Sequence, residues 1–208
     1  MPRVGLNTAD VVAAGAVMAD EAGIGAVSLA SLAERLGVKP PALYKHVENL
    51  GDLQHRIATQ AMTELGESLR DALQGKAGSD ALAAMFGAMR GYVAEHPGRY
   101  SATVGAEFQG QDDPLLAASV RVIRSIGAVL AGYGVPAGET DHAIRALRCV
   151  IHGFALLQAA NAFQWGNDPD ESFAWMIRFV DAGLRGMGGQ QTRRSRSGSC
   201  PCRLSPNG

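Results

Sequence analysis

Hydrophobic residues recur along most of the chain at the three- and four-residue spacing of α-helices, and no segment alternates strictly as a strand would. Segments with this spacing are separated by short stretches rich in Gly, Pro, Asn and Asp, which favour turns. We expect about nine helices, near residues 7–22, 28–36, 40–47, 50–73, 80–95, 98–108, 114–132, 140–164 and 170–187. The pattern predicts an all-α fold.

The second and third of these helices carry clear boundary signals. Ser28 can cap the second helix, because a serine hydroxyl accepts a hydrogen bond from a free N–H of the first turn. Gly37 follows that helix at a position where a left-handed residue is favoured. Pro40 and Pro41 fit only the first turn of a helix, so a third helix should begin there and run through Val47.

Two short helices joined by a glycine turn form the skeleton of a helix-turn-helix, whose second helix enters the major groove of DNA. The inward positions of the pair are Leu29, Leu32, Ala33, Leu36, Val38, Leu43 and Val47. The outward positions are Lys39, Pro40, Pro41, Ala42, Lys45 and His46, with Tyr44 at the edge. Lysine can donate to guanine or phosphate, and proline and alanine carbons can pack on a thymine methyl group. The same pattern would also suit an ordinary helical hairpin with solvated lysines.

Residues 7–56 resemble the N-terminal DNA-binding domain of the tetracycline-repressor (TetR) family of bacterial regulators, above all in "SLASLAERLGV" and "GVKPPALYKHVENLGDL". "HGFALLQAANAF" (152–163) is similar to a segment of the family's penultimate helix. The resemblance implies phosphate contacts at Ser28, Tyr44 and His46. It implies base-edge contacts at Lys39, Pro40, Pro41, Ala42 and Lys45. The family usually has a lysine where this chain has Leu50, which predicts weaker or less salt-sensitive DNA binding.

The resemblance also implies three regions. A helix-turn-helix DNA-binding domain would occupy 1–56, and a helical effector-binding and dimerisation domain 57–187. Residues 188–208 contain arginines but few apolar residues, which predicts a disordered tail. Family members pair through their last two helices, here about 140–187. The apolar residues on two sides of 140–164 suit such a homodimer.

A dimer would place its two helix-turn-helix domains about one DNA turn, or a multiple of it, apart on a near-palindromic double-stranded operator. The family is mostly made of repressors that a small-molecule effector releases from DNA, and we expect the same here. Candidate residues for the effector pocket are Met85, Met89, Tyr92, Phe108, His152, Phe154, Gln158, Asn161 and Phe163.

The net charge of −1 changes this picture in one respect. The four arginines of 188–208 have no acidic neighbour in that segment, so positions 1–187 carry a net charge of −5. A general electrostatic binder of nucleic acid should be basic. Any DNA contact of this chain must therefore be local and specific in geometry.

Other classes of protein find less support. The five histidines are scattered, and neither a nucleophile elbow nor a phosphate-binding loop is present, so we expect no enzyme and no cofactor. Cys200 and Cys202 have no second pair, so no metal site is expected, and Cys149 should be a core residue. The start lacks an apolar signal core and no run of about 20 apolar residues occurs, so we expect a cytoplasmic protein without a membrane partner. A helical protein–protein adaptor without DNA binding is the alternative.

Overall fold

The structure, a computed structural model, describes residues 6–164, 166 and 168–197, with side chains through Met187. These residues form eight α-helices and three short 3-10 helices and no strand, so the all-α prediction is confirmed. The helices are α1 (Thr8–Ala22), η1 (Ile24–Ala26), α2 (Leu29–Arg35), η2 (Pro40–Lys45), α3 (Leu50–Leu73), α4 (Gly78–Glu95), α5 (Pro97–Ala102), α6 (Pro114–Gly132), η3 (Ala137–Glu139), α7 (Thr140–Ala159) and α8 (Pro169–Ser197).

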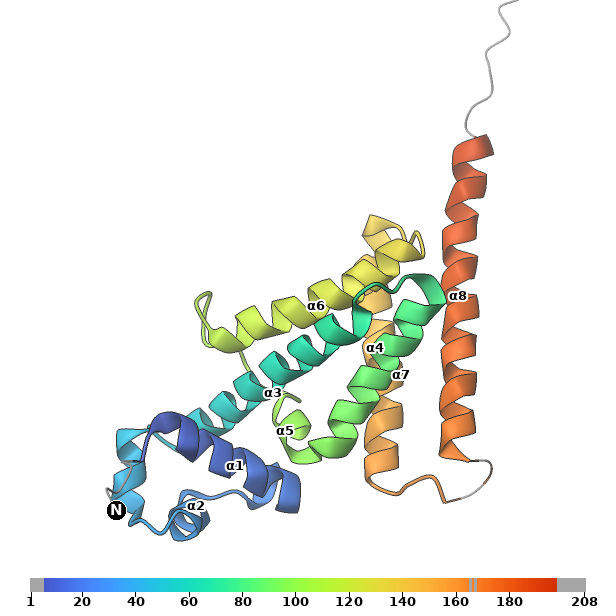
Figure 1. Ribbon diagram of the computed structural model, residues 1–208. Coiled ribbons are helices and arrows are strands. Elements are labelled where there is room, and N and C mark those ends of the chain that lie inside the picture. The colour runs from blue at the N-terminus through green and yellow to red at the C-terminus, as the bar shows by residue number, and fades with distance from the viewer. Residues whose placement is uncertain (1–5, 165, 167, 198–208) are drawn as a thin grey trace, which may run out of the picture.

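The chain buries its apolar side chains in two separate clusters. The first cluster lies between α1, α2, η2 and the beginning of α3, and includes Leu32, Leu43 and Ile57. The second begins at Ala61 of α3 and continues through α4–α8. The long helix α3 therefore belongs to both clusters, as Figure 1 shows, where α1 and α2 sit at one end of the molecule and α3 leads away from them. The change from one cluster to the other falls close to the proposed boundary at 56/57.

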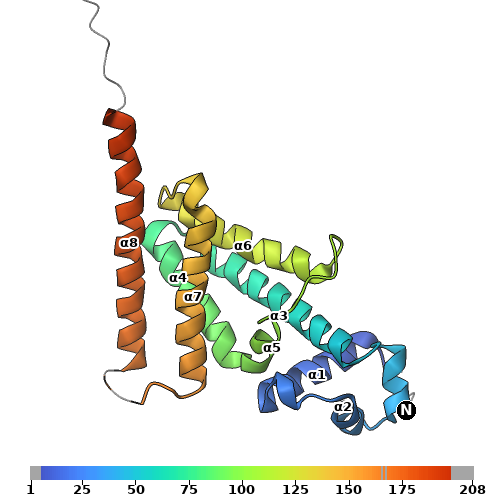
Figure 2. The same cartoon turned by 180° about the vertical axis from the view of Figure 1, so that it is seen from behind.

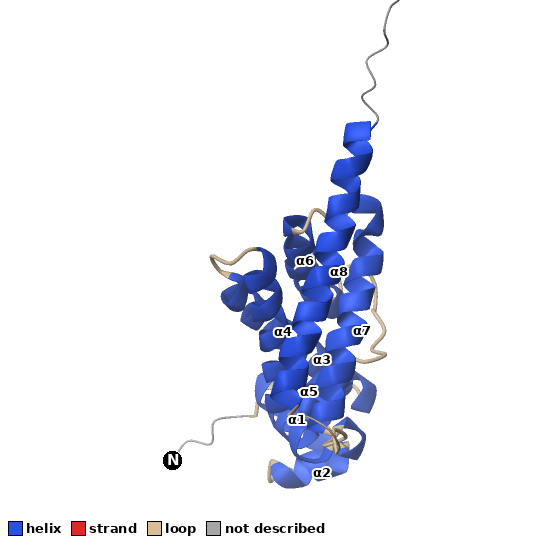
Figure 3. Cartoon of the chain, turned by 90° about the vertical axis from the view of Figure 1, so that its right-hand side faces the viewer, coloured by secondary structure: helices blue, strands red, loops and turns tan. Residues whose placement is uncertain are grey.

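In the larger part, α3 packs against α4, α5 and α6, and α4 packs against α7. Helices α7 and α8 run antiparallel beside each other, with α8 at the outer edge (Figures 1 and 2). The last turns of α8 project beyond the other helices, and the view in Figure 3 shows α7 and α8 together on one side of the molecule.

One helix, α6, is long and apolar enough to span a membrane by length and composition alone. In the fold its apolar side chains Leu115, Val122 and Ile126 are buried against the other helices. A core helix passes the same composition test, and Arg121 and Arg124 interrupt its apolar run.

Three helix boundaries differ from the prediction. Helix α5 ends at Ala102, well before residue 108, and the following loop contains Gly105 with a positive φ of 78°. Helix α7 ends at Ala159 and not at 164, because Asn161 turns the backbone into the left-handed region with φ 52°. The predicted disordered tail 188–208 is corrected over 188–197, where α8 continues to Ser197; Gln and Arg in this stretch are good helix formers. Residues 198–208 lie outside the described chain.

The prediction for Cys149 is wrong, because its side chain is exposed. Cys149 lies on α7, whose buried side chains are Ala143, Leu147, Ile151 and Ala155. Away from this buried side, the apolar side chains of Ala146 and Leu157 are exposed. A sequence pattern that is apolar on two sides cannot show which side meets the core of the same chain.

Candidate nucleic-acid interface and internal cavity

The N-terminus of α2 is held by a reciprocal pair of serines. The Ser28 hydroxyl accepts a hydrogen bond from the Ser31 N–H at 3.1 Å, and the Ser31 hydroxyl accepts one from the Ser28 N–H at 3.2 Å. Gly37 then adopts a left-handed φ of 66°, which lets the chain turn sharply toward η2. Ser28 is thus primarily a capping residue, and its side chain is partly exposed.

The segment after the turn is a 3-10 helix, whereas the sequence predicted a helix through Val47. Its first residues are Pro40 and Pro41, which have no N–H to donate and allow only a short first turn. The Ala42 N–H donates to the Lys39 carbonyl at 2.9 Å, three residues back, as in a 3-10 helix.

Two side chains anchor this segment and leave its other face free. Leu43 is fully buried in the first cluster, and Val47 is buried beside it. On the other face, Tyr44 is 59% exposed. The proposed contact residues Lys39, Pro40, Pro41, Tyr44 and Lys45 are all exposed, and Ala42 and His46 are partly exposed. The outward face predicted from the sequence is therefore accessible to a partner.

His46 and Leu50 connect this segment to its neighbours. The His46 Nδ1 lies 3.4 Å from the Thr8 hydroxyl at the start of α1, which ties the end of η2 to that helix. Leu50 begins α3 and packs against the first apolar cluster. In this chain the position thus contributes packing where a lysine would contribute charge.

A partly open cavity of about 510 Å³ lies in the larger part of the molecule. Its walls come from α3, α4, α5, the loop after α5, α6 and α7. The lining residues are Met62, Leu65, Met89, Tyr100, Thr103, Gly105, Ala106, Phe108, Leu115, Ser119, Val122, Ile123, Ile126, Asp141, Ile144, Arg145 and Arg148. The size is typical of small-molecule sites, which span roughly 300–1,000 Å³.

Of the nine residues that the sequence suggested for an effector pocket, Met89 and Phe108 line this cavity. Met85 and Tyr92 are buried in the second cluster without lining it. The other five residues are His152, Phe154, Gln158, Asn161 and Phe163, which also lie outside its wall. The sequence pattern could select apolar helix positions but could not show which of them border empty space.

The residues around Phe154 form a separate aromatic contact between α7 and α8. The ring centroid of Phe154 lies 5.0 Å from that of Phe163 and 5.1 Å from that of Phe173. The Arg90 guanidinium lies over the Phe173 ring at 4.5 Å and donates to the Gln158 side chain at 2.7 Å. These side chains therefore hold α4, α7 and α8 together.

His152 sits behind the cavity and supports its wall. Its Nδ1 lies 3.0 Å from the Tyr100 hydroxyl, and Tyr100 lines the cavity. Burial and the nearby Arg148 guanidinium lower the pKa of His152, so its imidazole is neutral at pH 7. The hydrogen bond between the Tyr100 hydroxyl and the His152 Nδ1 fixes the orientation of both rings.

A chain of polar contacts joins the cavity region to the first cluster. The Tyr92 hydroxyl of α4 donates to the Glu64 carboxylate of α3 at 2.8 Å, and Glu64 also pairs with Arg99 of α5 at 3.3 Å. The Asp20 carboxylate of α1 accepts the Arg99 backbone N–H at 2.9 Å and lies 3.2 Å from the His96 Nδ1. Burial opposes ionisation of Glu64, but its hydrogen bonds and the charge of Arg99 outweigh this and lower its pKa.

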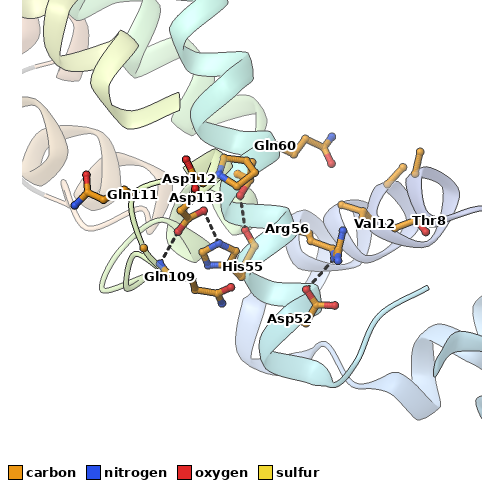
Figure 4. Close-up of a pocket in the computed structure, with 15 residues that line it drawn as sticks. Thr8, Val12, Asp52, His55, Arg56, Gln60, Gln109, Gln111, Asp112 and Asp113 are labelled. Atoms are coloured by element: carbon orange, nitrogen blue, oxygen red, sulfur yellow. Dashed lines mark hydrogen bonds and ion pairs between the residues drawn. The ribbon is translucent and has the colours of Figure 1, made fainter. Parts of the chain in front are cut away.

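A second cleft, of about 940 Å³, separates α1 from the loop before α6 and is shown in Figure 4. On one side of it, the His55 Nε2 of α3 lies 3.0 Å from the Asp113 carboxylate. Asp113 also accepts the backbone N–H groups of Gln109 and Leu115, at 2.7 and 2.8 Å. The contact between His55 and Asp113 thus attaches the start of α6 to α3.

Comparison with known proteins identifies the molecule's relatives. The chain is 32% identical over 184 residues to the uncharacterized HTH-type transcriptional regulator YobS of Bacillus subtilis (strain 168), which covers 88% of this chain and 95% of that protein. Residues 82–180 match the sequence model of the tetracyclin repressor-like C-terminal domain. The chain belongs to the tetracycline-repressor (TetR) family. It is a DNA-binding transcriptional regulator, as expected from its sequence.

Solved structures of TetR-like proteins share its fold. The crystal structure of BioQ with its double-stranded DNA operator matches with a TM-score of 0.63 and 20% identity, over 87% of this chain and 99% of that one. A TetR variant from Acinetobacter baumannii AYE, in complex with minocycline, matches with a TM-score of 0.60 and 21% identity, over 90% and 97%. At this level of identity the similarity to both structures shows a shared fold.

The sequence pattern did not predict several of the side chains that line the cavity. Tyr100, Ser119, Arg145 and Arg148 border the cavity, and none was a candidate. The sequence feature that could have indicated this site is the pair Arg145 and Arg148, two charged residues on one flank of a largely apolar helix. Among the described residues, no group of three potential metal ligands occurs.

Proposed function

We propose that this protein is a homodimeric repressor, which binds a near-palindromic operator through η2 and leaves it when a small molecule occupies the cavity between α3 and α7. The observation that carries the proposal is the outward face of η2. Leu43 of η2 and Val47, which follows η2, are buried, and Lys39, Tyr44 and Lys45 face outward with no described segment covering them. A segment held in this way can enter the major groove without unfolding.

Individual roles follow from the chemistry of these side chains. Lys39, Pro40, Pro41, Ala42 and Lys45 contact base edges, and Tyr44 and His46 donate to phosphate oxygens. Ser28, whose hydroxyl also caps α2, supplies a further phosphate contact.

The dimer forms through the uncovered faces of α7 and α8. On α7 these faces present Ala146, Cys149, Gly153 and Leu157, and on α8 they present Trp175 and Phe179. Trp175 and Phe179 are 60% and 65% exposed and stack on each other with ring centroids 5.4 Å apart. Large exposed apolar patches mark interaction sites, and a twofold pairing of the helix pair would bury this one in a four-helix bundle.

Signal transmission runs through α5. The cavity wall includes Tyr100 of this helix, and the same helix binds α1 through Arg99 and Asp20. A ligand that fits the cavity better when α5 is displaced would move α1, and with it η2. Such a ligand depopulates the DNA-binding form because it binds the other form more tightly. Minocycline bound to the Acinetobacter TetR variant supports a small-molecule ligand for this chain, but does not indicate that the ligand is minocycline.

The deciding experiment selects bound sequences from a random pool of double-stranded DNA with the full-length protein. We expect an enriched near-palindrome whose half-sites lie about one helical turn, or a multiple of it, apart. The absence of any enriched sequence would favour the alternative, a helical adaptor that binds proteins only. The cytoplasm is the proposed location, because an operator-binding protein must reach bacterial DNA.

A further inference from the structure

We propose that the ligand of the cavity between α3 and α7 is an amphipathic acid, with an apolar body inside and a carboxylate at the mouth against Arg145 and Arg148. This inference rests on the proposed function in taking the cavity as the effector site. It adds the chemical class of the effector, which neither the relatives nor the fold supplies.

The inner wall of the cavity is apolar. Met62, Leu65, Met89, Val122 and Ile126 are wholly or largely buried and contribute only carbon and sulfur atoms. Moving an alkyl or ring body from water into such a space is favourable, and each further buried methylene group adds to the gain. A ligand that fills the cavity should therefore have an apolar body.

The charged residues of the lining all come from one helix. They are Asp141, Arg145 and Arg148, which follow one another along a single flank of α7. The two arginines outnumber the acid, so the mouth carries one net positive charge. Neither arginine makes an ion pair with any described residue, which leaves both guanidinium groups available to a ligand.

The uncharged groups around the mouth agree with this assignment. Ser119 is 9% exposed, borders the cavity and makes no side-chain hydrogen bond to the described chain, so its hydroxyl can donate to a ligand oxygen. His152 lies nearby as a neutral ring bonded to Tyr100 and adds no charge. Phe108 and Ile123 are 53% and 47% exposed and also border the cavity, which gives its entrance an apolar edge.

The mouth also stays open in the proposed dimer. Arg145 and Arg148 share the flank of α7 with Ile144, which lines the cavity. The residues proposed for pairing, such as Ala146 and Gly153, lie on the other flank of the same helix.

A guanidinium group is well suited to binding the carboxylate of the ligand, because its planar fork forms two parallel hydrogen bonds with a carboxylate.

The experiment compares decanoate with 1-decanol, which has the same apolar chain and no charge, by calorimetric titration of the full-length protein. We expect decanoate to bind at least about tenfold more tightly, since a hydrogen bond to a charged group is stronger than one to a neutral group. Arg148→Gln and Arg145→Gln should each remove most of this preference and leave decanol binding within about twofold. Arg124→Gln, at an exposed position of α6 outside the cavity, is the matched control and should change neither affinity.

Equal affinity for both probes, a preference that survives loss of both arginines, or no binding of decanoate up to its solubility limit would each overturn the proposal. Arg148→Lys should keep part of the preference, because the charge remains. DNA binding by the ligand-free protein is measured separately. If the protein binds its operator but not decanoate, only the ligand class fails. If decanoate binds through the arginines while no operator is found, the ligand class stands and the regulatory function fails.

Discussion

Gly98 of α5 packs directly against the backbone of Ala19 in α1. A Cβ atom added at Gly98 would lie 1.8 Å from the Ala19 carbonyl oxygen and 2.5 Å from the Asp20 nitrogen, far inside any permitted contact. The neighbouring Arg99 N–H donates to the Asp20 carboxylate in the same place. This junction connects the part of the molecule that borders the cavity to the part that presents η2.

Replacing Gly98 by Ala should therefore push α5 away from α1. We expect a loss of roughly 1–3 kcal/mol in the free energy of unfolding, the usual cost of overpacking, measured by urea denaturation. The matched control is Gly91→Ala inside α4, where an added Cβ meets nothing within 4 Å. That change should stabilise the protein by about 0.5–1 kcal/mol, because alanine is the better helix former. Equal effects of the two substitutions would mean that the junction does not constrain the fold.

The outward lysine of η2 gives the most direct test of DNA binding. Lys45→Ala should weaken operator binding by about tenfold in a fluorescence-anisotropy titration, the effect of losing about 1.4 kcal/mol of contact energy. Tyr44→Phe should weaken it less, because only the hydroxyl contact is lost. Lys76→Ala is the control, since this exposed lysine lies in the turn between α3 and α4, away from η2. An unchanged affinity in both Lys45→Ala and Tyr44→Phe would mean that the DNA contacts lie outside η2.

Leu50 offers a change in the opposite direction. Leu50→Lys should restore a cation at the N-terminus of α3 and raise operator affinity by a few-fold. Its aliphatic stem can keep part of the packing that Leu50 makes with the first cluster. One additional phosphate contact should steepen the slope of log affinity against log salt by about 0.9. A slope identical to that of the wild type would show that this position lies away from the DNA backbone.

Phe179 is the most exposed large side chain on the proposed dimer face. Phe179→Asp should convert a dimer into a monomer in light-scattering measurements at micromolar concentration, and should weaken operator binding at least about tenfold because two linked helix-turn-helix domains bind better than one. Val104→Asp changes a side chain that is 50% exposed in the turn after α5 and should leave the dimer intact. A wild-type protein that is itself monomeric under these conditions would contradict the pairing.

Asp113 should make the protein sensitive to acid. Burial opposes its ionisation, but the N–H groups of Gln109 and Leu115 and the His55 ring outweigh this and lower its pKa from the ordinary 3.8. The folded state then binds the proton less readily than the unfolded state, so the stabilisation is present above about pH 4 and is lost as the pH falls through the lowered pKa. Asp113→Asn should be less stable than the wild type near pH 6, and urea titrations should show the difference shrink toward pH 3. A difference that is independent of pH would assign the effect to packing alone.

The sequence alone was sufficient for the features that act within a single helical turn. Ser28, Gly37 and the two prolines define their ends locally, because a cap or a missing N–H acts on residues three or four positions away. The outward face of η2 could be predicted for the same reason, since the buried residues Leu43 and Val47 lie within this short segment or directly after it. The winding of η2 and the end of α7 were missed, because several weak preferences compete there.

The cavity and the junction at Gly98 were decided only by the tertiary structure. A cavity exists where side chains from distant helices fail to meet, and no periodicity within one helix records that failure. The sequence therefore suggested Phe154 and Phe163, which fill space between α7 and α8, and missed Ser119 and Arg148, which border empty space. Which side of α7 is buried was likewise decided by the tertiary structure. Both of its faces are apolar in sequence, and only packing against α4 shows which one the chain itself buries.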